Sequence, residues 1–232
     1  FIDTIKAFKL LLKVYEVDQY IACATSAMRD AENGKDIIKE IETETGIKIE
    51  IISGELEAEI IYENHIAELL DHHKSYLYID VGGGSTELTL YDKANVVFQK
   101  SFNIGTVRIL TNKVKEETWD DLKDELKNLA KKYNNIIGIG SGGNINKVFS
   151  ISNKKQGELL HIDTIKNIYR ELQLLSLEER MQSYNLKKDR ADVIIPALSI
   201  YTNILKWANI NEIQVPKIGL VDGLIAHLYD SL

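Results

Sequence analysis

The stretch from Tyr76 to Tyr91 limits the fold of this chain more than any other part of the sequence. A short apolar run ends at Asp80, three glycines and two hydroxyl residues follow, and a second strand-like run begins at Leu88. This order predicts two strands joined by a tight turn, because glycine clusters between apolar runs are typical of turns. The sequence therefore predicts a hairpin whose tip is lined by glycine.

The tip of this hairpin is suited to binding an anion. Residues without a Cβ atom let an anion approach main-chain N–H groups, and the two hydroxyl groups add further donors. Asp80 at the mouth of the turn is placed to hold a hard cation opposite that anion, directly or through water. Without a metal, the Asp80 carboxylate would repel a phosphate, so a carboxylate beside a phosphate site indicates a bound metal. The alternative is a plain glycine-rich hairpin. The tip residues are Gly82, Gly83, Gly84, Ser85 and Thr86.

The composition is that of an ordinary globular protein and excludes several classes. The chain has 232 residues, 44% of them hydrophobic and 27% charged, which is enough for one large domain or two small ones. Its net charge of −7 argues against nucleic-acid and membrane-surface partners, although a local basic cleft still suits a polyanionic substrate. Cys23 is the only cysteine, so we expect no disulfide and a cytoplasmic location. No apolar run reaches the ~20 residues of a membrane span.

Two segments before the hairpin carry candidate functional side chains. Thr25–Arg29 forms a strand-to-helix turn in which Arg29 suits an anionic oxygen, the alternative being a surface ion pair. A later helix opens near Gly54 with Glu55, Glu57 and Glu59 close to its start. These carboxylates either complement the helix dipole or include a general base that faces a cleft. Both alternatives stay open on the residues alone.

A second glycine turn follows the hairpin in the sequence. Ile136–Gly140 predicts a strand, and Ser141, Gly142 and Gly143 then open a helix. A glycine turn at a helix N-terminus is suited to an anion or a nucleotide, because main-chain N–H groups point outward there. The alternative is a tight connection between strand and helix.

The remaining pattern predicts alternating helices and strands. Residues 1–17 form an amphipathic helix with Asp3 or Thr4 as its cap, and Gln19–Ala24 reads as a short buried strand. Another helix ends at Gly46. Residues 190–207 form a long helix that Pro196 is expected to kink or break.

A series of motifs follows in order along the chain: Ala24–Arg29, Ser53-Gly54 with Glu57-Ala58, Asp80–Glu87, Gly105–Arg108, Gly140–Gly143, Arg190–Asp192, and Gly219-Leu220 with Gly223-Leu224. Together they resemble the exopolyphosphatase and guanosine pentaphosphate phosphohydrolase family, part of the actin, Hsp70 and sugar-kinase superfamily. The resemblance covers nearly the whole chain. Each motif alone is weak, and the ordered set is specific.

The resemblance implies an α/β fold of two ribonuclease-H-like lobes around an interdomain cleft. Glu57 matches the family's catalytic glutamate, which orients the attacking water. Asp80 and Glu87 match acidic residues linked to magnesium and to that water, Gly82–Thr86 match the phosphate cradle, and Arg29 matches an arginine that faces the substrate. Phosphoryl transfer to water needs these functions: neutralised charge, in-line positioning and a carboxylate for the water.

The resemblance also sets the expected organisation. The first lobe is expected to comprise residues 1–54 plus 219–232, and the second lobe residues 55–218. The family begins with a first phosphate loop of the form Asp-Ile-Gly-Ser-Asn, which this chain lacks, and longer members carry a further helical domain. We therefore expect a short two-lobe form without its N-terminal phosphate loop, either as a fragment or as a form that has lost part of its phosphate grip.

These observations predict a Mg²⁺-dependent phosphohydrolase that removes terminal phosphate from inorganic polyphosphate, with guanosine pentaphosphate as a second substrate. Analogy with the family allows a homodimer. One alternative is an ATP-dependent small-molecule kinase of the same superfamily, in which Ser141–Gly143 contacts adenosine. Another is a non-catalytic sensor that binds polyphosphate or an alarmone. The roles of Arg108 and Arg190 stay open between substrate contact and structural ion pair.

Overall fold

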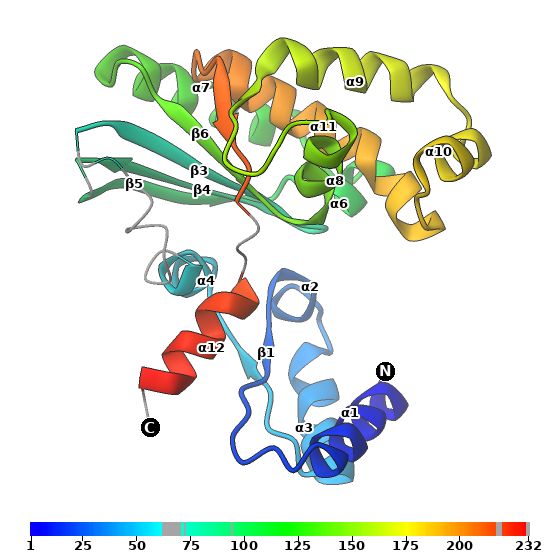
Figure 1. Ribbon diagram of the computed structural model, residues 1–232. Coiled ribbons are helices and arrows are strands. Elements are labelled where there is room, and N and C mark those ends of the chain that lie inside the picture. Colours follow the sequence, from blue (N-terminus) through cyan, green and yellow to red (C-terminus); the bar gives the residue numbers. More distant parts are fainter. Residues whose placement is uncertain (62–70, 72, 94, 217–219, 231–232) are drawn as a thin grey trace. The chain divides into compact units, whose positions relative to one another are not determined.

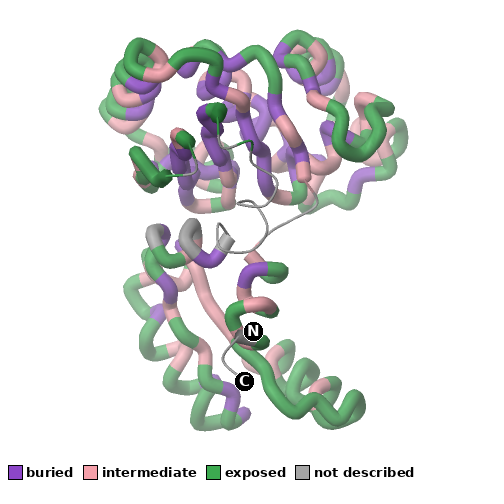
Figure 2. Tube along the Cα trace, turned by 60° about the vertical axis from the view of Figure 1, so that its left-hand side comes forward, coloured by how far each residue is buried: buried purple, intermediate pink, exposed green. Residues whose placement is uncertain are grey.

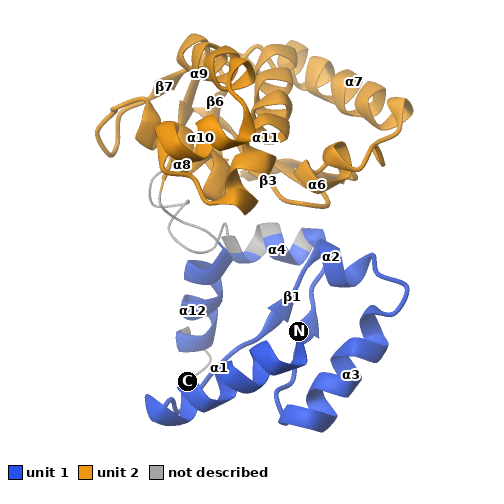
Figure 3. Cartoon of the chain, turned by 90° about the vertical axis from the view of Figure 1, so that its right-hand side faces the viewer, with its two compact units in different colours: residues 1–65, 220–232 blue, residues 66–219 orange. Residues whose placement is uncertain are grey.

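The computed structural model describes residues 1–61, 71, 73–93, 95–216 and 220–230. The chain divides into two compact units, residues 1–65 with 220–232 and residues 66–219 (Figure 3). The sequence predicts a boundary after residue 54. In the structure, α4 (Gly54–Ile61) belongs instead to the first unit, where Gly223 of α12 packs on Ile60.

The first unit combines a small parallel sheet with helices. Strand β1 pairs with β2 in parallel, with Cys23 opposite Glu50 and Ala24 opposite Ile51. Helix α1 packs against α3, and α4 packs against α12. The elements are α1 (Ile2–Val14), β1 (Cys23–Ala24), α2 (Ser26–Arg29), α3 (Gly34–Thr45), β2 (Glu50–Ile51), α4 and α12 (Leu220–Asp230).

Local sequence signals in this unit were right about the elements and less accurate about their ends. The first helix is present but starts at Ile2, with Phe1 as its N-cap and no capping side chain, so the predicted cap at Asp3 or Thr4 is wrong. The predicted strand over residues 19–24 shortens to Cys23–Ala24, which is half-buried. Gly46 ends α3 in the left-handed conformation, as predicted.

The second unit is built on a six-stranded sheet with the order β5-β4-β3-β6-β8-β7. Figure 1 labels four of these strands, β3 to β6. The predicted hairpin is confirmed: β3 and β4 pair antiparallel, and β4 continues antiparallel to β5. Strand β6 is parallel to β3 and β8 is parallel to β6, whereas β7 is antiparallel to β8. The strands are β3 (Ser75–Val81), β4 (Thr86–Asp92), β5 (Asn95–Phe102), β6 (Ile137–Ser141), β7 (Leu160–His161) and β8 (Glu212–Gln214).

The two faces of the sheet in this unit differ, and helices cover the apolar one. Alternate side chains of β3 and β4, such as Ile79 and Leu88, pack into one core with Leu126 of α7 and Ile194 of α11. Figure 2 shows the resulting band of buried residues. Successive strand residues point to opposite sides, so the other face of these strands carries buried tyrosines together with Asp80 and Glu87. The helices are α6 (Thr106–Leu110), α7 (Glu116–Lys132), α8 (Gly143–Ile151), α9 (Ile162–Leu174), α10 (Leu177–Tyr184) and α11 (Lys188–Trp207).

The long helix α11 crosses the core of the second unit. It continues through the buried Pro196 instead of breaking there. Among the described residues, no helix is both long and apolar enough to cross a membrane. The mixed α/β fold class predicted from the sequence is confirmed.

Candidate phosphate and metal site

Asp80 and Glu87 form a carboxylate pair across the β3–β4 hairpin. They are directly opposite one another in the register, so their side chains lie on the same face of the sheet. Glu87 is buried, and its Oε1 accepts hydrogen bonds from Ser85 Oγ at 2.6 Å and Ser101 Oγ at 3.0 Å. The two hydroxyl donors fix the orientation of this carboxylate, because each constrains the same oxygen atom.

The electrostatics of the pair favour a bound cation. Burial, followed by the negative charge of Glu87, raises the pKa of Asp80 from 3.8 to about 7. Two adjacent carboxylates cannot both ionise without a cost in free energy, and a positive charge between them removes that cost. The donor set consists of hard oxygen atoms, which is the ligand type that Mg²⁺ prefers. Within the described residues no group of three or more acidic, histidine or cysteine side chains gathers to hold a metal.

The tip of the hairpin turns its carbonyl groups toward helix α6. The Gly82 carbonyl accepts from the N–H of Thr106 at 3.0 Å, and the Gly83 carbonyl accepts from the N–H of Val107 at 2.9 Å. Arg108 Nε donates to the Gly84 carbonyl at 2.5 Å. Helix α6 and its arginine therefore hold three consecutive carbonyls of the tip.

This arrangement points the N–H groups of the hairpin tip outward. In a planar trans peptide, each carbonyl and the N–H of the following residue point in opposite directions. The N–H groups of Gly83, Gly84 and Ser85 therefore point away from α6. Within the part of the chain that the structure describes, those of Gly83 and Gly84 have no main-chain acceptor. Outward N–H groups of this kind are suited to an anion.

The close approach of α6 requires glycine at the start of that helix. A Cβ atom added to Gly105 would lie 2.4 Å from the Gly83 carbonyl oxygen and 2.5 Å from the Gly84 carbonyl carbon. Contacts this short do not occur between real atoms, so a side chain here would force the hairpin and α6 apart. Gly105 thus lets α6 pack on the glycine tip, although more than twenty residues of sequence separate the two.

The two hydroxyl residues of the tip do not face the outward N–H groups. Thr86 is fully buried, and its Oγ1 donates to the carbonyl of Ile104 at 2.5 Å. Ser85 is buried as well and donates to Glu87. The structure thus places both hydroxyls in support of the site: Thr86 holds the segment before α6, and Ser85 orients a carboxylate.

The second glycine turn lies beside Asp80. Strand β6 runs parallel to β3 with Ser141 opposite Asp80, and Gly142 is the N-cap of α8. Gly142 has a φ of 98°, and a Cβ atom there would lie 3.3 Å from Asp80 Oδ1. The turn needs glycine for two reasons, the positive φ and the closeness of the carboxylate. The tertiary structure therefore brings Ser141–Gly143 next to the carboxylate pair.

Arg190 contacts the same turn from α11. Its Nη1 lies 3.2 Å from Asn144 Oδ1, and its guanidinium group packs against the Cα of Gly143. Gly143 and Arg190 line a cavity of about 510 Å³ beside α8, together with Lys147, Lys187 and the carboxylate of Asp189. The three cations of this lining outnumber its one carboxylate, which favours an anion there. The sequence left the roles of Arg108 and Arg190 open; the structure places them on the hairpin tip and on the second glycine turn.

The two candidates from the N-terminal part of the chain both belong to the first unit. Glu57 is half-buried near the start of α4, where Ser53 Oγ accepts from the N–H of Leu56 at 3.1 Å and caps the helix. Arg29 ends α2, and its Nη1 donates to the Ile52 carbonyl at 2.9 Å. Arg29 also lines a cavity of about 550 Å³ in this unit. Their catalytic roles stay predictions.

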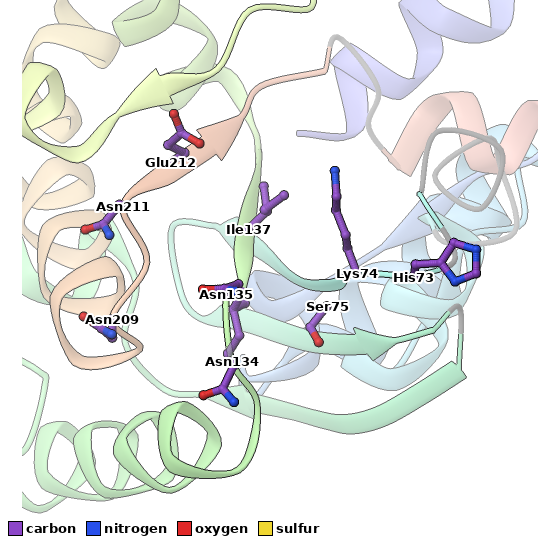
Figure 4. A pocket seen from close by; sticks show the side chains of 10 residues that line it. His73, Lys74, Ser75, Asn134, Asn135, Ile137, Asn209, Asn211 and Glu212 are labelled. Atoms are coloured by element: carbon purple, nitrogen blue, oxygen red, sulfur yellow. The ribbon is translucent and has the colours of Figure 1, made fainter.

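Another cavity lies at the opposite ends of the strands from the carboxylate pair. It has a volume of about 450 Å³, and its walls come from the segments that precede β3, β6 and β8. Figure 4 shows Asn134 and Asn135 on one side and Asn209 and Asn211 on another, with Lys74 nearby. None of the predicted site residues lines this cavity, so the carboxylate pair and the glycine turns are the candidate site.

Fold and site together define a class of protein. The order β5-β4-β3-β6-β8, antiparallel in its first three strands and parallel afterwards, is the ribonuclease-H-like arrangement. Paired carboxylates and two glycine turns at one end of such a sheet are typical of the phosphate-handling proteins of the actin-like superfamily.

The chain belongs to the Ppx/GppA phosphatase family, whose model matches residues 1–232. It is 32% identical over 228 residues to the bifunctional 3-dehydroquinate synthase/phosphatase of Fusobacterium nucleatum, covering 88% of this chain and 34% of that protein. It is 26% identical over 224 residues to the guanosine-5'-triphosphate,3'-diphosphate pyrophosphatase of Pseudoalteromonas translucida, covering 90% of this chain and 44% of that protein. The chain thus spans less than half the length of these relatives.

Solved structures agree with the fold. An exopolyphosphatase from Cytophaga hutchinsonii has a TM-score of 0.84 and 24% identity, covering 99% of this chain and 81% of its own. The Ppx-GppA enzyme of Aquifex aeolicus has a TM-score of 0.74 and 25% identity, covering 97% of this chain and 81% of its own. The predicted family and fold are therefore confirmed.

Proposed function

We propose that the protein is a Mg²⁺-dependent phosphohydrolase that releases terminal phosphate from inorganic polyphosphate, with guanosine pentaphosphate as a second substrate. The observation that carries this proposal is the Asp80–Glu87 pair at the mouth of a hairpin whose N–H groups point outward. The names of the relatives support the two substrates, since one is an exopolyphosphatase and another acts on a guanosine polyphosphate.

The chemistry follows from what the described groups are able to bind. The outward N–H groups of Gly83 and Gly84 are donors for phosphate oxygens, and the Ser141–Gly143 turn with Arg190 provides a second set beside them. Donors fixed by a rigid hairpin need no reorganisation when negative charge develops on the transferred phosphoryl group. The chain thereby holds and orients the terminal phosphate.

The carboxylate pair fits Mg²⁺. Asp80 and Glu87 would hold the ion, with phosphate oxygens and water completing its coordination in the manner usual for Mg²⁺. When bound, the metal neutralises charge on the phosphate and on the two carboxylates. Ser85 and Ser101 keep Glu87 oriented for this role.

The first unit supplies the remaining groups in this proposal. Glu57 orients the attacking water and accepts its proton, and Arg29 binds a substrate oxygen. Both assignments rest on the match of their motifs to the family. A half-buried carboxylate such as Glu57 is a suitable general base, because it is accessible yet partly shielded from bulk water.

The test is phosphate release from long-chain polyphosphate in the presence of Mg²⁺. We expect release by the wild-type protein and at least a ~100-fold loss in Glu57→Gln, because a general base contributes about 10²–10⁴-fold. Glu116→Gln is the matched control, since Glu116 is an exposed carboxylate in the first turn of α7. It removes a similar charge from a helix start and should leave the rate unchanged.

Two outcomes would contradict the proposal in different ways. A wild-type protein that binds polyphosphate tightly and releases no phosphate would be a sensor. Transfer of phosphate from ATP to an added small molecule, with little transfer to water, would identify a kinase. If Glu57→Gln were as active as Glu116→Gln, the protein would still be a hydrolase, but Glu57 would not be its general base.

A further inference from the structure

The hydroxyl group of Tyr201 in α11 contacts the main chain of two strands where the candidate site begins. Its oxygen lies 3.0 Å from the carbonyl oxygen of Ile79 in β3 and 2.8 Å from that of Ser141 in β6. Ile79 directly precedes Asp80, and Ser141 directly precedes Gly142. The Tyr201 side chain is 1% exposed, so water does not substitute for these contacts.

Each of these contacts acts on the peptide group that links the carbonyl to the next residue. Because the peptide unit is planar and trans, a carbonyl held in one direction sends the next N–H in the opposite direction. The bond to Ile79 therefore orients the peptide of Asp80, and the bond to Ser141 orients the peptide of Gly142. These are the two residues whose closeness brings the carboxylate pair and the second glycine turn together.

The tyrosine is a permanent donor. Burial, followed by the charge of Asp80, raises the pKa of Tyr201 well above 10, so the phenol keeps its proton. A carbonyl oxygen only accepts hydrogen bonds, so the single hydroxyl proton is shared between the two carbonyls. One hydroxyl thus ties β3 to β6 at this level of the sheet.

Helix α11 holds the tyrosine rigidly and links it to Arg190. Residues 190, 194, 197 and 201 lie on one face of the helix at successive spacings of four, three and four. Ile194, Ala197 and Tyr201 on this face are all buried in the core. Arg190 at the start of the face contacts Gly143 and Asn144. The same helix face therefore contacts the Ser141–Gly143 turn at both of its ends.

We propose that Tyr201 is a positioning residue that sets the orientation of the Asp80 peptide relative to the Gly142–Gly143 turn. Tyr201 touches neither substrate nor metal in this proposal and acts through the two main-chain carbonyls. The inference rests on the proposed function, because the two segments it holds are the ones assigned to Mg²⁺ and phosphate.

The experiment compares Tyr201→Phe with Tyr184→Phe. Both remove one hydroxyl, but Tyr184 lies at the end of α10 and its hydroxyl donates to Glu171. The first readout is the pair of amide resonances of Asp80 and Gly142 in ¹H–¹⁵N NMR spectra. The second is phosphate release at saturating Mg²⁺ and polyphosphate. Trp119 and Trp207, which pack edge to face at 6.1 Å, report by fluorescence that the second unit is folded.

We expect Tyr201→Phe to shift both amide resonances and to lower the rate of phosphate release about 10-fold, because small misplacements of binding groups cost one to two orders of magnitude. Tyr184→Phe should change neither readout. Unshifted resonances of Asp80 and Gly142 in folded Tyr201→Phe would overturn the inference. A rate within about twofold of the wild type would overturn it too, since misplaced groups cost more than that.

A double-mutant cycle with Gly142→Ala separates positioning from general stability. If Tyr201 acts through the Gly142 turn, loss of its hydroxyl lowers the rate of phosphate release much less once Gly142→Ala has distorted that turn. The two rate losses then do not multiply. Rate losses that multiply fully would contradict the inference. If the wild-type protein releases no phosphate, the proposed function fails. The amide resonances of Asp80 and Gly142 alone then test whether Tyr201 positions these two residues.

Discussion

Asp80 and Glu87 face one another across the β3–β4 hairpin, and burial, followed by the negative charge of Glu87, raises the pKa of Asp80 to about 7. Most carboxylates in folded proteins titrate near pH 4, so this pair carries a cost in free energy at neutral pH. A cation bound between the two carboxylates would relieve this cost.

The first prediction concerns the stability of the metal-free protein. Between pH 3.8 and about pH 7 the folded state holds a proton on Asp80 that the unfolded state has lost. The free energy of unfolding therefore falls as pH rises through this range and levels off above it. Asp80→Asn should remove the slope and increase stability at pH 8 by on the order of 2 kcal/mol. Urea unfolding in EDTA, followed by tryptophan fluorescence, measures both effects.

A matched control for this prediction is Glu125→Gln. Glu125 of α7 forms an ion pair with Lys100 of β5 at 3.0 Å. Its replacement should leave the slope between pH 4 and 7 in place. A wild-type protein whose stability rises over this range would show that Asp80 is not the proton carrier.

The second prediction concerns the metal. Mg²⁺ should raise the unfolding temperature of the wild-type protein, since a ligand that binds only the folded state stabilises it by mass action. The rise should be larger at pH 8 than at pH 6, where Asp80 holds a proton that competes with the ion. Asp80→Asn should abolish most of it. Equal shifts in the variant and the wild type would place the ion elsewhere.

The third prediction concerns the second glycine turn. Gly142→Ala strains a backbone with φ of 98° and places a methyl group 3.3 Å from Asp80 Oδ1. Phosphate release should fall about 10- to 100-fold, because the carboxylate is displaced. Gly157→Ala is the matched control: its φ is 90°, but nothing lies within 4 Å of the added Cβ. It should lose about 1 kcal/mol of stability and keep its activity. Equal activity of the two variants would remove the role of Gly142.

The fourth prediction separates two threonines of β4. Thr86→Val removes the bond to the Ile104 carbonyl and should destabilise the protein by about 1–3 kcal/mol. Thr89 is equally buried, and its hydroxyl has no hydrogen-bond partner among the described residues, so Thr89→Val should be neutral or stabilising. The Michaelis constant for polyphosphate should stay unchanged in Thr86→Val. A large increase in that constant would mean that Thr86 binds phosphate directly.

Much of the molecule follows from local sequence. The hairpin of β3 and β4, helix α3 with its end at Gly46 and the start of α8 at a glycine turn were all predicted, because periodicity and glycine placement act within a few residues. The ordered motifs also identified the family. Strand β7 was missed: it has two residues, and only its pairing with β8 makes it a strand.

The tertiary structure decided how the site is assembled. Asp80 meets Gly142 because β3 and β6 are parallel neighbours, although more than fifty residues separate them. Thr86 donates to the carbonyl of Ile104, which precedes α6, so its hydroxyl holds a segment that lies eighteen residues further along the chain. Tyr201 reaches Ile79 across 122 residues of sequence. The sequence by itself determined most of the elements and the chemical groups, since these depend on neighbours along the chain. Packing between distant segments decided short strands such as β7 and which groups meet.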